Sequence, residues 1–461
     1  MTASPASEAR RVSPPALGPE RPVAWPRRTV RTLSNGLQVV LAESHTFPKM
    51  SAELFMRSGN AVVAHRMPGL AEMTASVVRT GTESRPSRRI EEDLRRMGAE
   101  LSTSAGADSS AIAIGGLAEF SEGMLELVAD LAQHAIFPAD EFERERRQRL
   151  EELRIERTTP GFLAGERLRR VLFDPHPYAI VTPTEAQVQA YRLEELQDFY
   201  RTHYVPEDSL LVLVGDFSTD RMMDQVGRIF DAWGGRKPAA SPAAAPPDIR
   251  GRRVHLVHLP GTVQTDVLVG NRAITRQSPD WLRLTLANSI YGGAFNSRLV
   301  RNIREQKGYT YSPRSAVHPL RQHGYFTVHA AVRNDVVAAS LAEIFYEIER
   351  MRAIPVGADE LADARNYLTG VFSLGVATQD GLMGQLATVY LERLPEDYLE
   401  TYRERIRALE AQDVLLATRK YFDSPNAQIV AVGDREQIGE QAALFGDLEV
   451  YDAQGKKLEG M

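Results

Sequence analysis

Cysteine is absent from the 461 residues of this chain. Its absence excludes disulfide bonds, thiol nucleophiles and cysteine-bound metals, and leaves histidine, aspartate and glutamate as plausible metal ligands. No apolar run approaches the roughly 20 residues that cross a bilayer. Charge of one sign does not accumulate either, because 55 Lys and Arg stand against 61 Asp and Glu, a net charge of −6. We therefore expect no membrane span and no nucleic-acid partner.

A secretory signal is also missing from the N-terminus as written. The first thirty residues contain six prolines and no apolar stretch of roughly 7–15 residues. We expect residues 1–30 to form a disordered, proline-rich tail. We also expect a soluble protein, for which the cytoplasm and the periplasm both stay open.

The rest of the chain consists of two halves with similar sequences, which indicates an internal duplication. Leu196–Asp216 and Val414–Asp434 each contain a helix, a turn and an apolar strand that ends in Gly-Asp. Between the halves, residues 234–250 are rich in proline and alanine and cannot continue a helix or a central strand. The expected segments are a tail (1–30), an N-terminal domain (31–233), a linker (234–250) and a C-terminal domain (251–461).

Each half is expected to be an α+β unit. Alternation of apolar and polar residues predicts strands, and apolar residues at helical spacing predict helices. In the first half the expected strands are 37–41, 52–56, 111–117 and 210–214, and the expected helices are 69–78, 87–97, 122–133, 140–157 and 193–202. Strands and helices do not alternate regularly, so a parallel doubly wound sheet is less favoured than an α+β layer.

The segment Gly69–Thr82, GLAEMTASVVRTGT, resembles the zinc motif of one metallopeptidase family without its metal ligands. The insulinase and pitrilysin-like peptidases, the inverzincins, carry H-x-x-E-H in such a segment. In that family the two histidines bind zinc and the glutamate activates the metal-bound water. Here Glu72 and Ser76 stand at the ligand positions, and Ala75 stands at the position of the general base.

The resemblance also implies a third ligand on a long helix, which corresponds to Glu152 or to the neighbouring Glu151. Ala75 cannot accept a proton, and Ser76 is a poor zinc ligand. Glu152 lies among alternating charges, where a solvated glutamate is the simpler interpretation. No two of the ten histidines are four residues apart, and His176 is interpreted as structural. We expect no metal bound by this chain.

The second half keeps a different motif of the same family. Tyr291–Leu299 reads YGGAFNSRL, and Asn302–Ser312 reads NIREQKGYTYS. In active relatives the Arg and the Tyr of this motif hydrogen-bond the substrate backbone around the scissile carbonyl, and the matching residues are Arg304 and Tyr311. Such donors stabilise a developing oxyanion. The alternative is that Arg304 is a helix-surface arginine and Tyr311 an aromatic residue of a strand.

One branch of the family, that of the processing peptidases, pairs two related chains around a chamber. One chain supplies the zinc helix, and the other supplies the Arg/Tyr pair and has a degenerate zinc motif. The resemblance implies that this chain is a catalytically silent subunit of a heterodimeric zinc endopeptidase, with two duplicated α/β-sandwich domains. Zinc is then expected in the H-x-x-E-H partner, and a peptide is the expected substrate.

Peptide docking as an added strand is expected near Leu101–Asp108, the edge strand that relatives use. The usual Asn-Ala pair is replaced there by Ser102-Thr103, which differs from the pattern of the family. Two other functions stay open: a structural or assembly protein like the core proteins of respiratory complexes, and a divergent metallopeptidase whose own site uses Glu72 and Glu152. Stoichiometric zinc in the purified chain would favour the last of these.

Overall fold

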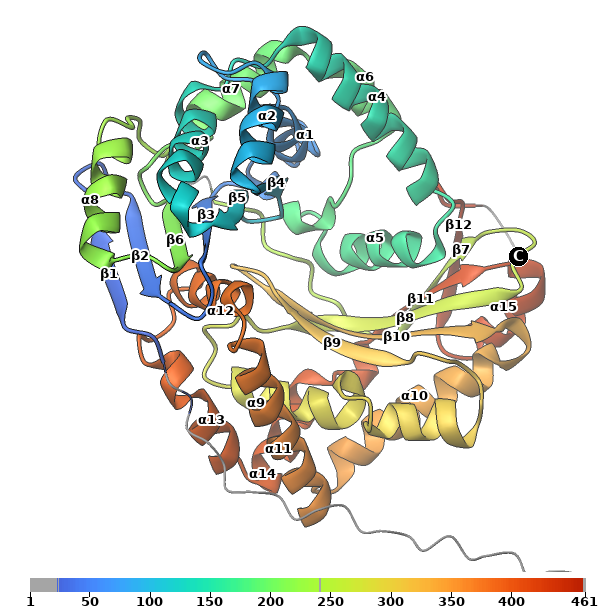
Figure 1. The fold of residues 1–461 in the computed structure, drawn as a ribbon. Coiled ribbons are helices and arrows are strands. Elements are labelled where there is room, and N and C mark those ends of the chain that lie inside the picture. The colour runs from blue at the N-terminus through green and yellow to red at the C-terminus, as the bar shows by residue number, and fades with distance from the viewer. Residues whose placement is uncertain (1–22, 24, 240–241, 459–461) are drawn as a thin grey trace, which may run out of the picture.

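The computed structural model describes residue 23, residues 25–239 and residues 242–458, which form two six-stranded sheets with helices on both faces (Figure 1). The strand order is β1-β2-β6-β3-β5-β4 in the first sheet and β12-β7-β11-β8-β10-β9 in the second. The first sheet contains β1 (Arg28–Thr32), β2 (Gln38–Glu43), β3 (Lys49–Met56), β4 (Glu100–Ala105), β5 (Ser110–Leu117) and β6 (Leu210–Gly215). The second contains β7 (Arg253–His258), β8 (Gln264–Ala273), β9 (Arg314–Pro319), β10 (Gly324–Arg333), β11 (Gln428–Gly433) and β12 (Asp447–Tyr451).

The five strands that follow the outermost one have the same order and direction in both sheets. β2 runs parallel to β6 and β7 runs parallel to β11. The other pairs among these five strands are antiparallel. Only the outermost strand differs: β1 is antiparallel to β2, whereas β12 is parallel to β7. The mixed sheets confirm the α+β fold and the duplication.

Helices complete both halves. The first half contains α1 (Leu70–Val78), α2 (Ser87–Met97), α3 (Ser121–His134), α4 (Ala139–Glu156), α5 (Pro160–Phe173), α6 (Glu185–Ala190), α7 (Leu193–His203) and α8 (Thr219–Phe230). The second contains α9 (Trp281–Asn288), α10 (Val337–Ala353), α11 (Ala358–Gly375), α12 (Gln379–Leu391), α13 (Tyr398–Ala408), α14 (Ala411–Tyr421) and α15 (Arg435–Ala443). All strands and helices expected in the first half are present, with ends shifted by a few residues.

The predicted tail, residues 1–30, extends too far toward the C-terminus, because its last residues belong to a strand. Residues 28–32 form β1, which pairs with β2 from Arg28 opposite Ala42 to Thr32 opposite Gln38. Residues 1–22 and 24 of that tail lie outside the described residues. Residues 234–239 and 242–250 of the expected linker form no helix or strand, and the domain limits stay a prediction.

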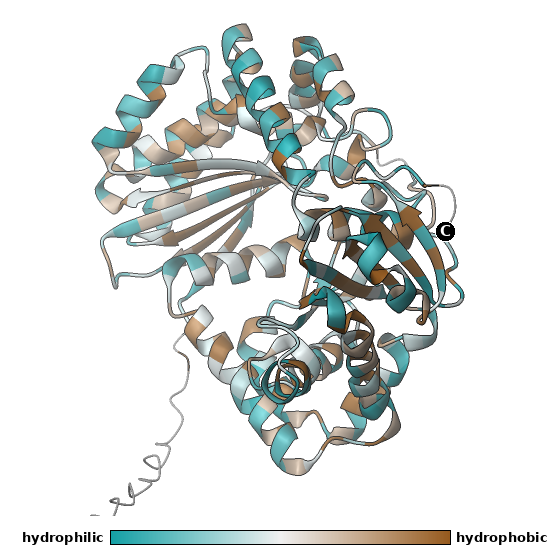
Figure 2. Cartoon of the chain, turned by 90° about the vertical axis from the view of Figure 1, so that its right-hand side faces the viewer, coloured by the Kyte–Doolittle hydropathy of each residue, from teal (hydrophilic) through white to brown (hydrophobic). Residues whose placement is uncertain are grey.

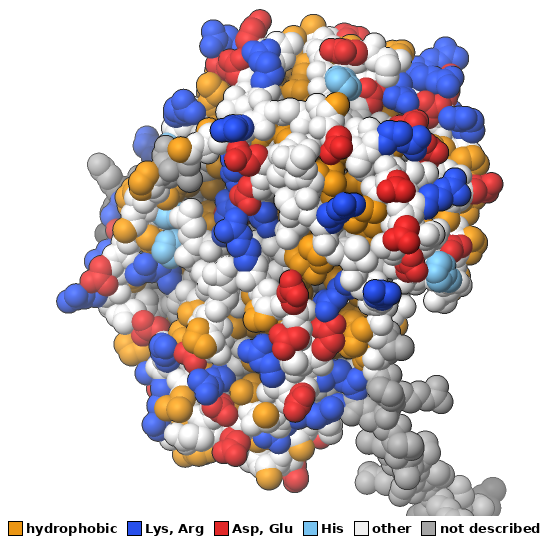
Figure 3. All heavy atoms as spheres, turned by 90° about the vertical axis from the view of Figure 1, so that its left-hand side faces the viewer, with side chains coloured by type: hydrophobic (Ala, Val, Ile, Leu, Met, Phe, Trp, Pro, Cys, Tyr) orange, Lys and Arg blue, Asp and Glu red, His pale blue; other side chains and the backbone are white. Residues whose placement is uncertain are grey.

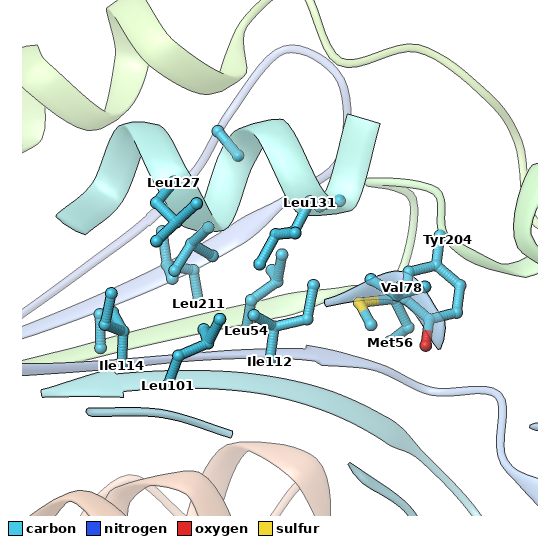
Figure 4. Packing of buried hydrophobic residues seen from close by; sticks show 14 of the residues in the cluster. Leu54, Met56, Val78, Leu101, Ile112, Ile114, Leu127, Leu131, Tyr204 and Leu211 are labelled. Atoms are coloured by element: carbon cyan, nitrogen blue, oxygen red, sulfur yellow. The ribbon is translucent and has the colours of Figure 1, made fainter. Parts of the chain in front are cut away.

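The core of the first half lies between its sheet and the helices above it. Leu127 and Leu131 of α3 point onto the sheet residues Leu54, Ile112 and Ile114 (Figure 4). Alternate residues of each strand therefore form one apolar face. Figure 2 shows the same pattern at the scale of the chain, with hydrophobic strands and outer helices in which hydrophilic residues alternate with hydrophobic ones.

The opposite face of each sheet is covered by a helix from the other half. Helix α12 packs beneath the first sheet against β6, and α5 packs over the second sheet against β11 (Figure 1). Leu386 and Val212 belong to the buried cluster at the first of these interfaces, and Leu168 and Val430 to the cluster at the second. The two halves therefore bury each other's sheets. Acidic and basic side chains are interspersed on the face that Figure 3 shows. None of the helices in the described ranges has the length and apolarity of a membrane span.

Candidate functional site

Helix α1 carries the degenerate zinc motif and begins at a residue that must be small. Gly69, just before the helix, has φ +77° and a left-handed conformation. A Cβ atom there would lie 2.8 Å from Cδ of Pro183. The hydroxyl of Tyr191 donates a hydrogen bond to the carbonyl of Pro68. The start of α1 is therefore tightly fixed, as a catalytic helix would need, although the ligands are gone.

The three changed motif positions have ordinary structural surroundings. Ala75 is buried in the domain core. The Ser76 hydroxyl donates to the Glu72 carbonyl, one turn earlier in the same helix, at 3.1 Å. Glu72 lines a cavity of about 50 Å³ between α1 and α4, together with Ser76 and Glu152. These positions offer no imidazole, and the predicted position of the general base holds an alanine.

Arg149 of α4 occupies the centre of this cluster, and its side chain is only 11% exposed. Its guanidinium nitrogens lie 2.8 Å from Glu156 Oε1, 3.5 Å from Glu152 Oε2 and 3.9 Å from Glu72 Oε2. It also donates to the hydroxyl of Thr182 at 3.0 Å. One arginine therefore interacts with all three carboxylates of this cluster.

The pKa directions agree with this ion cluster. Burial raises the pKa of Glu72, and the nearby charge of Arg149 opposes that rise. Burial works against the charge of Arg149, but the hydrogen bond to Glu156 and the glutamates around it raise the pKa of the guanidinium. Arg149 is therefore a permanent cation in this site.

Zinc does not fit the residues at this site. Within the described residues, no group of three or more His, Asp or Glu side chains is arranged to hold a metal ion. A guanidinium close to Glu72 and Glu152 would also repel a second cation. Glu151, the alternative third ligand, is largely exposed and pairs with Arg154. The geometry thus gives no support to an independent metallopeptidase site on Glu72 and Glu152.

The second motif is held firmly against its own half. Arg298 makes two hydrogen bonds, of 2.8 and 2.6 Å, to the carboxylate of Glu360 on α11. Asn302 donates to Glu347 of α10 at 2.9 Å, and the Thr310 hydroxyl donates to a carbonyl of β10 at 2.6 Å. In the glycine-rich turn, a Cβ at Gly292 would lie 2.6 Å from the Ser315 hydroxyl. The segment is anchored on both sides of Arg304.

Arg304 and Tyr311 lie side by side on this anchored segment and remain accessible. The Arg304 guanidinium carbon lies 4.7 Å from the ring centre of Tyr311 and 4.9 Å from that of Phe295. Tyr311 is 80% exposed and Phe295 is 64% exposed. In the part of the chain that the structure describes, no carboxylate forms an ion pair with Arg304. A cation held between two open aromatic rings is available to a partner or ligand.

The structure keeps the two predicted sets of site residues apart. Glu72, Ala75, Ser76 and Glu152 belong to α1 and α4, whereas Arg304 lies on the short helix η5 (Val300–Gln306), which packs against α10. No hydrogen bond or ion pair between described residues joins the two sets. Any joint action of the Arg/Tyr pair with a zinc helix would therefore use the zinc helix of another chain.

Two functional neighbours were not predicted from the sequence. Arg149 looked like one more residue of a solvated charged helix, although its place one turn before Glu152 was a usable signal. Phe295 looked like part of a packing turn.

His176, interpreted as structural, is buried and accepts a hydrogen bond from the amide of Tyr178 at 3.1 Å. Its ring also lies 3.0 Å from Gln322 Oε1 of the other half.

Comparison with known proteins identifies relatives along most of the chain. An uncharacterized zinc protease of Rickettsia bellii is 24% identical over 89% of this chain and 98% of its own length. One of Streptomyces coelicolor is 24% identical over 91% of this chain and 92% of its own. The crystal structure of a peptidase M16 inactive domain from Pseudomonas fluorescens superposes with a TM-score of 0.82 at 24% identity, covering 88% of this chain and 98% of that one.

A protease from Helicobacter pylori gives a TM-score of 0.81 at 20% identity, covering 88% of this chain and 99% of that one. These structural likenesses support the fold. Two sequence models match in order: insulinase (peptidase family M16) over residues 38–171 and the peptidase M16 inactive domain over residues 191–368. Together they cover more than half of the chain, and the second match begins just before α7 of the first half. The chain therefore belongs to peptidase family M16, the insulinase family.

Proposed function

We propose that this chain is the catalytically silent subunit of a heterodimeric zinc endopeptidase. In this proposal a homologous chain with an intact H-x-x-E-H helix binds the zinc, and the two chains enclose a peptide chamber. Arg304 and Tyr311 complete the site of that partner in trans. The observation that carries the proposal is the contrast between the two motifs: an arginine fills the first, whereas the second is anchored, charged and open.

The chemistry assigned to the pair is substrate binding and stabilisation of charge. A peptide carbonyl under attack develops negative charge on its oxygen, and a guanidinium and a phenol can both donate to it. The guanidinium of Arg304 offers several N–H donors in a planar arrangement. Its two aromatic neighbours restrict the guanidinium plane, so less side-chain entropy is lost when a substrate binds. The zinc of the partner, when bound there, would supply the activated water.

The test mixes the purified chain with a homologue from the same genome that carries H-x-x-E-H and measures cleavage of a quenched fluorescent peptide. We expect activity of the mixture to exceed that of either chain alone. Removing one oxyanion donor typically lowers kcat by about 10²–10³, so Arg304→Ala and Tyr311→Phe should each lower kcat by about that factor while the complex still forms.

Matched controls are Arg301→Ala, an exposed arginine one turn earlier in the same segment, and Tyr346→Phe, an exposed tyrosine on α10. Both should leave cleavage unchanged. Two results would refute the proposal: a partner as active alone as in the mixture, or a mixture that tolerates Arg304→Ala together with Tyr311→Phe. A stable complex with the second result would favour the structural or assembly function instead.

A further inference from the structure

An arginine-rich pocket of about 310 Å³ lies at the beginnings of α9 and α13 and contains no residue of either motif. The two helices pack side by side in the second half (Figure 1). One wall is the loop that leads into α9, and the other is the loop between α12 and α13. Gln277 joins the two loops, because its Nε2 donates to the Glu392 carbonyl at 2.7 Å. The volume is that of a small-molecule site.

The lining of this pocket carries positive charge. Its charged side chains are Arg276, Arg393 and Arg405, and its described residues include no aspartate or glutamate. Arg393 forms an ion pair with Asp208 at 2.9 Å. Among the described residues, no carboxylate forms an ion pair with Arg276 or Arg405. Glu392 lies outside the lining, and burial raises its pKa although the charge of Arg276 opposes the rise. Two guanidiniums are therefore available to an anion.

Aromatic rings hold these two guanidiniums at the pocket. The guanidinium carbon of Arg276 lies 4.7 Å from the ring centre of Trp281, and that of Arg405 lies 5.8 Å from the ring centre of Tyr398. Trp281 is the first residue of α9, and Tyr398 is the first residue of α13. The N-termini of two helices thus border the pocket and add positive partial charge. The ring contacts restrict both arginines, so less side-chain entropy is lost when a ligand binds.

A buried hydroxyl at the pocket has no partner. Tyr398 is only 5% exposed, and its Oη has no group in hydrogen-bonding geometry among the described residues. Burial raises the pKa of this phenol, and the charges of Arg276 and Arg405 oppose the rise, so both guanidiniums lie near the hydroxyl. A buried donor without a partner costs free energy. An oxyanion that enters between the two arginines would give this hydroxyl an acceptor.

We propose that this pocket binds a phosphate group and that its occupant is a small phosphate monoester. Two guanidiniums without carboxylate partners match the two charges of a phosphate dianion, and their planar N–H donors suit its oxygens. A carboxylate would balance only one of them. The lining also contains apolar residues that leave room for a small organic group beside the phosphate, namely Pro279, Leu282, Leu394 and Pro395. The inference does not depend on the trans-acting role proposed for the chain.

The experiment titrates the full chain with phenyl phosphate and, separately, with inorganic phosphate. Binding is measured by isothermal titration calorimetry at low ionic strength and at about pH 8, where the phosphate group is mostly a dianion. We expect saturable binding of both anions, with the lower Kd for phenyl phosphate. Benzamide, a neutral molecule with the same ring, should not bind. Equal Kd values for the two anions would support a phosphate site and would identify the inorganic ion as its occupant.

Variants of the lining test which groups hold the phosphate. Arg276→Gln and Arg405→Gln each remove one guanidinium and should raise the Kd of phenyl phosphate by about tenfold. Arg276→Lys keeps the charge without the planar donors and should give an intermediate Kd. Tyr398→Phe removes only the hydroxyl and should also weaken binding. The matched control is Arg407→Gln, at an exposed arginine in the same last turn of α13 and outside the lining, which should leave Kd unchanged.

Three results would overturn the inference: no saturable binding of either anion, equal binding of benzamide, or an unchanged Kd in both Arg276→Gln and Arg405→Gln. Arg405 is exposed, so its replacement keeps the fold, and circular dichroism checks this for every variant. The assay involves no cleavage and no partner chain. Its failure would leave the proposed heterodimer to the activity test, and failure of that test would leave the phosphate site standing.

Discussion

The two halves share their packing scheme and differ in the residues that it buries. Each sheet is covered by a helix of the other half, α12 on the first and α5 on the second. Glu53 pairs with Val212 in the first sheet, and Leu268 pairs with Val430 at the matching place in the second. The leucine packs against α5, whereas Glu53 is a carboxyl beneath α12. Duplication preserved the backbone arrangement, and the side chains at the interface diverged.

The helices that carry the motifs differ in the same way. Helix α4 of the first half carries Glu152, which with its neighbour Glu151 is predicted to match the third ligand of relatives, and the residue of α11 that matches Glu152 is Val371, which is exposed. In the first half Arg149 thus lies among Glu72, Glu152 and Glu156 beside the degenerate motif. The second half presents Arg304 and Tyr311 instead. One half keeps the backbone of its motif without metal-binding side chains, and the other presents an exposed Arg/Tyr pair, for which we propose action in trans.

Restoring zinc to the first half is the strongest way to break this contrast. Glu72→His, Ala75→Glu and Ser76→His together rebuild the motif, but Arg149 still lies among the ligands. We expect this triple variant to bind zinc about a hundredfold more weakly than the same variant with Arg149→Ala. The reason is that a fixed cation must leave before a metal dication can bind the same carboxylates.

The measurement is zinc content after dialysis against a weak chelator, followed by competitive titration. Arg147→Ala on the same helix serves as the matched control for removal of an arginine. Stoichiometric, tight zinc in the triple variant with Arg149 present would show that Arg149 does not block the site. The wild-type chain should retain no zinc under the same conditions.

Much of the fold followed from the sequence because its signals are local. The apolar strand Leu210–Gly215 and its copy Gln428–Gly433 are completely buried and read as strands from composition alone. β1 was not predicted because its residues RTVRT are polar and half-exposed, and only pairing with β2 defines it. Helix α5 was missed because its apolar face covers the other half, an arrangement that no local pattern reveals.

The candidate site was predictable in its residue types and not in its contacts. The residues that follow Gly69 identified the helix, and the sequence alone showed that the two motif histidines are absent. The role of Arg149 depends on which face of α4 is buried. Because charged residues lie on every face of this helix, its sequence does not identify the buried face. The same limit applies to Phe295, whose contact with Arg304 spans a turn and a helix.

Replacing Glu53 by the residue of the other half tests the second difference. Burial raises the pKa of Glu53 to about 7 from 4.5. The unfolded chain then loses this proton at lower pH than the folded chain, so stability falls as pH rises from about 4.5 to 7 and the full loss persists above 7. We expect Glu53→Leu to stabilise the protein above pH 7, by at most about 3 kcal/mol.

Urea unfolding at about pH 5 and pH 8 measures this effect. The gain from Glu53→Leu should be small at the lower pH and largest at the higher one, and Glu53→Gln should show the same trend. Glu119→Gln, at an exposed carboxyl in the short 3-10 helix Ala118–Phe120, provides the control. Equal gains at both pH values would mean that Glu53 is not a strained carboxyl and that the two interfaces differ only in shape.

Ser76→Ala is the smallest change that still separates the halves, because it removes only a hydroxyl at one of the two predicted ligand positions of the first motif. Among the described residues, the Ser76 hydroxyl bonds only to the Glu72 carbonyl of its own helix, and that carbonyl also accepts the ordinary helical hydrogen bond. Alanine favours the helix and loses no partner. We expect the free energy of unfolding to change by less than about 0.5 kcal/mol, and cleavage by the complex to stay unchanged. A loss of activity in the mixture, with normal assembly, would mean that the first half still contacts substrate through α1, and the division of roles between the halves would have to be redrawn.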